Sequence, residues 1–68
     1  MSDVVRIEFE CNPPVDGSAA DVFIDGQEVG TMVYSKDLDQ WNDCLNPGDV
    51  ADQFPWGCAY KMIEFYRG

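Results

Sequence analysis

The chain has only 68 residues from which to build a hydrophobic core. A domain of this size buries about 60% of the surface that its unfolded chain exposes, so its core barely offsets the entropy lost on folding. The sequence therefore predicts a single compact domain over residues 1–68. Disulfides, metals or a partner chain commonly add stability to domains this small.

The cysteines do not suggest a disulfide framework. Cys11, Cys44 and Cys58 are odd in number and lack CxxC spacing, and the chain has no histidine to complete a zinc site. We expect three reduced thiols that pack as small apolar side chains, and neither a metal nor another cofactor. Reduced thiols are typical of the cytoplasm, and the stretch 1–6 lacks the pattern of a secretory signal.

The first half of the chain has the pattern of strands. Apolar and polar residues alternate over 4–11, which predicts a half-buried strand, and the prolines and glycine of 12–18 predict a loop. Strands over 21–24 and 29–34 then predict a hairpin. A four-residue turn places Ile24 opposite Val29, whereas a two-residue turn at Asp25 and Gly26 sets Ile24 against Gln27. We favour the longer turn, because it matches apolar with apolar residues.

The second half combines a predicted helix with an ambiguous end. Leu38, Trp41 and Leu45, with Cys44, recur at helical spacing, which predicts a helix within 35–45 that is capped by Ser35 or Asp37. Leu38, Trp41 and Leu45 are expected to share its buried face. Residues 59–67 fit either a strand paired with the first strand or a helix, and their aromatic content favours the strand. The predicted fold class is α+β, with a small three- to four-stranded antiparallel sheet and one short helix packed on a face.

Charge is the strongest indication of function. The chain has 13 acidic and 4 basic residues, and its net charge of −9 exceeds what solubility requires of a small domain. Such a charge repels nucleic acid and anionic membranes as direct ligands. We expect a basic protein surface as the partner, such as that of a nucleic-acid-binding complex, and a homodimer as a further source of burial.

Enzymatic chemistry has little support in the sequence. Without histidine there is no imidazole base and no Ser/His or Cys/His pair, and neither a GxGxxG motif nor a P-loop is present. A chain this short also has little room to enclose a substrate. We therefore expect no catalytic residues and no enzymatic activity.

In its small size, its Asp-rich charge and its lack of histidine, the chain resembles the small acidic inhibitors of phages and mobile elements, which include anti-CRISPR proteins and DNA mimics. The resemblance implies a non-enzymatic protein that blocks a basic, nucleic-acid-handling surface, in the host cytoplasm if the chain is phage-encoded. The alternative is a small structural or assembly module, such as a virion or scaffold protein, that oligomerises through sheet edges.

The candidate partner-binding residues are acidic, with one aromatic anchor. Trp56, in an expected aromatic corner over 54–57, is the anchor. The acidic candidates are expected on the helix and its following loop (Asp37, Asp39, Asp43, Asp49 and Asp52) and on the sheet (Glu8, Glu10, Asp21, Asp25 and Glu28).

Overall fold

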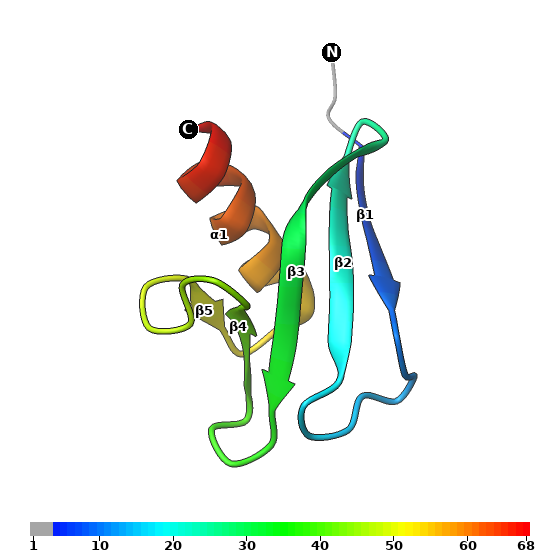
Figure 1. Cartoon of the computed structure of the whole chain (residues 1–68), viewed down its shortest axis with the longest axis vertical. Coiled ribbons are helices and arrows are strands. Elements are labelled where there is room, and N and C mark those ends of the chain that lie inside the picture. The colour runs from blue at the N-terminus through cyan, green and yellow to red at the C-terminus, as the bar shows by residue number, and fades with distance from the viewer. Residues whose placement is uncertain (1–3) are drawn as a thin grey trace.

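The computed structural model describes residues 4–68, so half of the stretch read for a secretory signal lies outside the described residues. The fold is an antiparallel sheet with one C-terminal helix across a face (Figure 1). In chain order the elements are β1 (Val5–Phe9), β2 (Ala19–Ile24), β3 (Gln27–Ser35), β4 (Gln40–Asp43), β5 (Ala51–Asp52) and α1 (Pro55–Arg67). The α+β class is confirmed, but the sheet has five strands instead of three or four, and they follow one another in sequence order.

The predicted first strand and loop are confirmed. In β1, Val5 and Ile7 lie opposite Ile24 and Val22 of β2, and their side chains share the face that α1 covers. The loop over 12–18 packs against the end of β3, where the Gly17 N–H donates to the carbonyl of Tyr34 at 2.8 Å. In the strand order of the sheet, β1 is one edge and the two-residue β5 is the other.

The β2–β3 hairpin has the shorter turn, so the predicted four-residue turn is wrong. Ile24 lies opposite Gln27, and Asp25 and Gly26 have φ values of 51° and 83°. Positive φ at both central positions defines the tight turn that an Asp-Gly pair favours. A bulge in the register at Val22 and Phe23 then adds one residue to β3. This extra residue returns the apolar side chains of β3 to the covered face, so local turn chemistry and burial are both satisfied.

The predicted helix within 35–45 is wrong, because this segment holds the last residue of β3, the β3–β4 turn, strand β4 and the start of the next loop. Trp41 is 2% exposed, but Leu38 and Leu45 are 64% and 79% exposed, so the three do not share a buried face. Asp39 adopts a φ of 50°, which suits a tight turn. Trp41 packs from β4 against Tyr34 of β3 with ring centroids 5.3 Å apart, and this cross-strand pair favours the hairpin.

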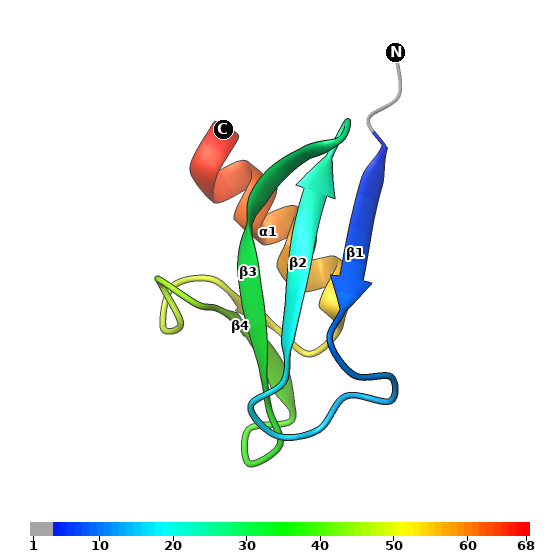
Figure 2. The ribbon, with the colours of Figure 1, turned by 45° about the vertical axis from the view of Figure 1, so that its right-hand side comes forward.

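The helix lies instead at the C-terminus, where a strand was favoured. α1 begins at Pro55, a residue well suited to the first helical position, and it buries Cys58, Ala59 and Met62. Figure 2 shows α1 running obliquely across one side of the sheet. It covers an apolar surface that includes Val22 and Met32. Burial of this surface outweighs the strand propensity of the aromatic residues, so the helical alternative for 59–67 is correct.

The opposite face of the sheet is left uncovered by the described residues (Figure 2). We call it the open face. It carries the side chains that alternate with the core-facing ones, and these include Glu8, Asp21, Thr31, Val33 and Asn42. In the part of the chain that the structure describes, no helix is long and apolar enough to cross a membrane.

Candidate functional site

The open face is flat and partly acidic. One cross-strand row runs from Ala19 through Val33 and Asn42 to Ala51, so small and short side chains line most of its width. The neighbouring row runs from Glu8 through Asp21 to Thr31. A row of short side chains across several strands is suited to contact with another macromolecule.

Two carboxylates oppose each other in the acidic row. Glu8 of β1 lies directly opposite Asp21 of β2, an arrangement that destabilises a sheet when it is unrelieved. The Thr31 hydroxyl donates to Asp21 at 2.9 Å, and Arg6 forms an ion pair with Glu8 at 3.3 Å. Both side chains of the ion pair are more than half exposed, so the pair compensates only weakly. The row is therefore a place where an incoming cation would be favoured.

A second group of carboxylates gathers at one end of the sheet, where the loop after β1 meets the β3–β4 hairpin (Figure 1). We call this group the acidic end; its members are Glu10, Asp16, Asp37 and Asp39, and all four are exposed. The backbone N–H of Lys36 donates to Asp16 at 2.9 Å and so joins the two loops. Two residues twenty positions apart in sequence are thereby brought together.

Two carboxylates of the acidic end also organise their own loops. The hydroxyl of Tyr34 donates to Asp39 at 3.1 Å, and this hydrogen bond raises the pKa of Tyr34. Asp16 accepts the bond from Lys36. Asp37 is exposed and is free to meet a partner. The expectation that Asp37 and Asp39 lie on a helix is wrong, but both lie on the surface.

The remaining acidic candidates are spread elsewhere. Asp25 and Glu28 are exposed at the β2–β3 hairpin, at the opposite end of the sheet from the acidic end (Figure 1). Asp49 is exposed in the loop between β4 and β5. Asp43 is only 1% exposed, and it accepts hydrogen bonds from Tyr66 and from the Asn46 side chain. It cannot reach a partner surface, and it acts in folding by joining β4 to α1.

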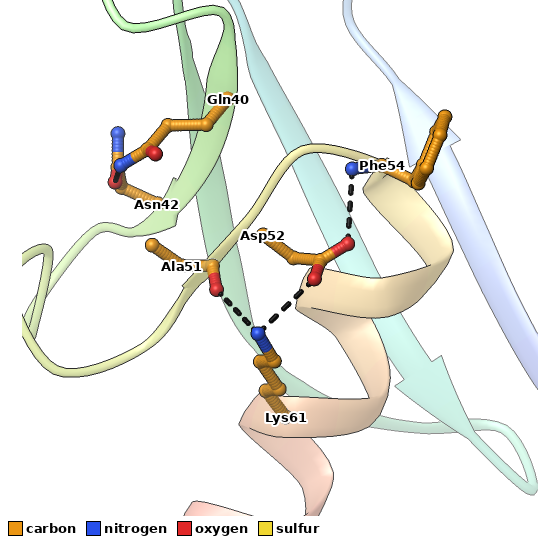
Figure 3. A network of polar contacts seen from close by, with 6 residues as sticks. All are labelled: Gln40, Asn42, Ala51, Asp52, Phe54 and Lys61. Atoms are coloured by element: carbon orange, nitrogen blue, oxygen red, sulfur yellow. Dashed lines mark hydrogen bonds and ion pairs between the residues drawn. The ribbon is translucent and has the colours of Figure 1, made fainter.

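Asp52 of β5 contacts α1 at two places, at Phe54 just before the helix and at Lys61 within it (Figure 3). Its carboxylate accepts the Phe54 N–H at 3.0 Å and pairs with the Lys61 ammonium at 3.0 Å, and these contacts lower its pKa in that order of importance. Lys61 also donates to the carbonyl of Ala51 at 2.9 Å. This network aligns the start of the helix, which begins without a side-chain cap. Asp52 is thus occupied within the chain.

Trp56 lies in the first turn of α1, whereas the sequence placed it in an irregular corner. It is 56% exposed and stacks on Phe54 with ring centroids 4.8 Å apart and planes 11° from parallel. Tyr60, four residues on along the same flank of the helix, is 59% exposed. We call Phe54, Trp56 and Tyr60 the aromatic strip; the stacked pair of Phe54 and Trp56 within it can anchor a partner.

A carboxylate, a tyrosine hydroxyl and a thiol line one hollow of the described residues. The hollow has a volume of about 280 Å³ and lies beside Asp43, Cys44 and Tyr66, and the Cys44 thiol is exposed. The Cys58 thiol lies elsewhere in the core, and burial raises its pKa to about 11. Tyr66 has a raised pKa, chiefly because its hydroxyl donates to Asp43. Between residues 4 and 68, no three side chains of the metal-binding types gather closely enough to hold an ion.

Sequence reasoning missed the open face, the hydrogen bond between Asp43 and Tyr66, and the aromatic strip as a unit. The alternation of 4–11 and 19–24 contained the signal for the open face, but recognition of that face required knowing which side the helix covers. Asp43 and Tyr66 are 23 residues apart, and no local pattern relates them. No protein-family model, curated protein or solved structure matches the chain.

Proposed function

We propose that this protein is a non-enzymatic acidic binding protein that blocks a basic, nucleic-acid-handling surface of another protein. The observation that carries the proposal is the uncovered acidic row beside the acidic end. Glu8 and Asp21 repel each other across two strands, and they lie on the same sheet as the carboxylates of the two adjoining loops. A basic surface would relieve this repulsion.

Charge compensation within the chain is small. Among residues 4–68 the structure forms two ion pairs, Arg6 with Glu8 and Lys61 with Asp52. Most carboxylates remain exposed to solvent, and several accept hydrogen bonds that orient them. Oriented carboxylates on a rigid sheet can replace phosphates at a basic surface and release the same counterions as a nucleic acid does.

Trp56 supplies the short-range part of the proposed interface. Acidic residues at a rim steer the encounter and mainly raise the association rate, whereas a buried aromatic anchor mainly slows dissociation. The stack of Phe54 on Trp56 fixes the anchor before binding, so little side-chain entropy is lost. The two kinds of residue should consequently be separable by kinetics.

The test begins with capture of partners from a bacterial lysate on the immobilised protein, followed by surface plasmon resonance with each captured protein. We expect affinity to fall steeply with sodium chloride and competing DNA or RNA to displace the protein. The double variant Asp37→Asn/Asp39→Asn removes two charges from the acidic end. The matched control Asp25→Asn/Glu28→Gln removes two charges from the opposite hairpin.

Both double variants remove two negative charges, so a difference between them reports where those charges lie. Asp37→Asn/Asp39→Asn should slow association more than the control does. Trp56→Ala should mainly accelerate dissociation. Binding that is insensitive to salt and to competing nucleic acid would reject the proposal. Equal effects of the two double variants would show that net charge, and not the acidic end, attracts the partner.

A further inference from the structure

Within residues 4–68 no strand pairs with the outer edge of β1, which leaves a set of its backbone hydrogen-bonding groups unpaired. The Glu10 N–H donates to Ala19 and the Asp25 N–H donates to Val4, both at 2.9 Å. In an antiparallel pair, alternate residues turn their backbone groups toward the neighbour. The even-numbered residues of β1 therefore bond to β2, and the N–H and C=O groups of Val5, Ile7 and Phe9 point away from the sheet.

This edge lacks three of the features that commonly protect a sheet from further pairing. β1 contains no proline, no lysine and no bulge in its register with β2. Its core-facing side carries Val5, Ile7 and Phe9 and is therefore apolar. This side is not fully covered, since Val5 and Ile7 are only partly buried and Phe9 is 39% exposed. Figures 1 and 2 both show α1 leaving the length of this edge free. A further strand could add here without displacing any element.

The side chains of β1 form a pattern that is complementary to itself. Ile7 is the central residue, with Arg6 and Glu8 on either side and Val5 and Phe9 beyond them. If a second β1 runs antiparallel about a two-fold axis at Ile7, Arg6 of each copy lies opposite Glu8 of the other. Val5 lies opposite Phe9 in the same way, and the outward backbone groups of the two strands meet.

The charges select this register. Moving the second strand by two residues in one direction brings Arg6 opposite Arg6, and moving it in the other brings Glu8 opposite Glu8. A shift of one residue would turn apolar side chains to the opposite face and mismatch the backbone groups. The register with Glu8 opposite Glu8 also sets Arg6 opposite Glu10, but only the axis at Ile7 pairs opposite charges without any like-charge pair and keeps the faces aligned.

We infer that the protein forms a homodimer through antiparallel pairing of β1 with β1 of a second copy, with the two-fold axis at Ile7. An isologous interface must be complementary to itself, and opposite charges on the two sides of Ile7 meet this requirement. A strand from a different protein would match them only by chance. The second copy also places an arginine beside Glu8, on the side away from Asp21, and so relieves the like-charge pair. The pairing buries less than a standard interface of about 1,600 Å², so the dimer should depend on concentration.

The inference does not rest on the proposed function, although both involve Glu8, whose repulsion by Asp21 the second copy would partly relieve. It uses the edge of the sheet, leaves the open face uncovered and extends that face across both copies. A test of self-association needs no other partner, so its failure would leave the basic-surface proposal untouched. In the same way, failure of the basic-surface experiment would not affect the dimer.

The experiment is sedimentation equilibrium of the intact chain from micromolar to millimolar concentration. The wild-type mass should rise toward that of two chains. Arg6→Glu and Glu8→Arg should each weaken self-association by more than about tenfold, because each creates two like-charge contacts. Mixing the two variants in equal amounts should restore the dimer, because each then supplies the charge that the other lacks.

The double variant Arg6→Glu/Glu8→Arg exchanges the charges within one chain and should dimerise like the wild type. Circular dichroism verifies that every variant is folded, which is expected because both positions are exposed. Hydrogen exchange provides a residue-level measurement, since dimerisation should protect the amides of Val5, Ile7 and Phe9. A wild type that stays monomeric, or a mixture that sediments as monomers, would overturn the inference.

Discussion

Gly30 of β3 lies against Met62 of α1, and the effect of a side chain at Gly30 on the docking of α1 can be tested by a double-mutant cycle. A Cβ atom added at Gly30 would lie 3.1 Å from Cε of Met62, which is closer than ordinary van der Waals contact. Met62 is fully buried in the core between α1 and the sheet. Gly30→Ala should therefore force the methionine end to move, and the cost should vanish once that atom is removed.

The expected magnitudes follow from the burial of Met62. Truncation by Met62→Ala should destabilise the protein by about 2–5 kcal/mol, out of the about 3–10 kcal/mol that a domain of this size possesses. Gly30→Ala alone combines a steric cost of about 1–3 kcal/mol with a gain of about 0.5–1 kcal/mol from replacing a strand glycine. In the Met62→Ala background only the gain should remain, so Gly30→Ala should raise the free energy of unfolding there instead of lowering it.

Urea unfolding, followed by the fluorescence of the chain's tryptophans, measures each free energy of unfolding. Tyr60→Ala, on the exposed flank of the same helix, is the matched control and should change stability far less than Met62→Ala. If Met62→Ala does not fold, Met62→Leu serves as the background, because leucine lacks the Cε atom. A coupling between the two positions below about 0.5 kcal/mol would refute the docking of α1 over Gly30.

Other predictions concern the corrected core and two titrating groups. Leu45→Asp should change stability by less than about 0.5 kcal/mol because Leu45 is exposed, whereas Trp41→Ala should cost about 3–5 kcal/mol in the same urea assay. The thiol of Cys58 should react with Ellman's reagent only after unfolding. Its raised pKa means that the unfolded chain loses this proton first, so stability should decline from about pH 9 to 11, and Cys58→Ala should remove that part of the decline. The pKa of Asp52 is lowered, first by the Phe54 N–H, so its contribution is present above the unfolded pKa of 3.8 and is lost as pH falls through the lower folded value. Acid titration of Asp52→Asn should lack this component. Sodium chloride should raise the melting temperature, since screening weakens repulsion among the exposed carboxylates; a fall would show that pairing dominates.

Local sequence chemistry determined the parts of the fold that depend on near neighbours. The alternation of Val5, Ile7 and Phe9 with charged residues specifies a half-buried strand wherever that strand is placed. The Asp25-Gly26 pair determines a two-residue turn, because positive φ at both positions suits these residue types better than others. That local preference was a better guide than the apolar matching that favoured a longer turn, since a bulge later corrected the register.

Only the tertiary structure decided the nature of the two ambiguous segments. The spacing of Leu38, Trp41 and Leu45 fits a helix, yet only the tryptophan reaches the core, where β3 and β4 hold it. The residues of α1 have strand propensity, but the apolar face of the sheet needs a cover, and the last segment of the chain is available to provide it. The acidic candidates followed from composition, whereas their separation into a buried Asp43, an occupied Asp52 and an exposed acidic end depends on contacts between residues far apart in sequence. Burial is a property of the whole packed chain, and for that reason no local pattern could have decided it.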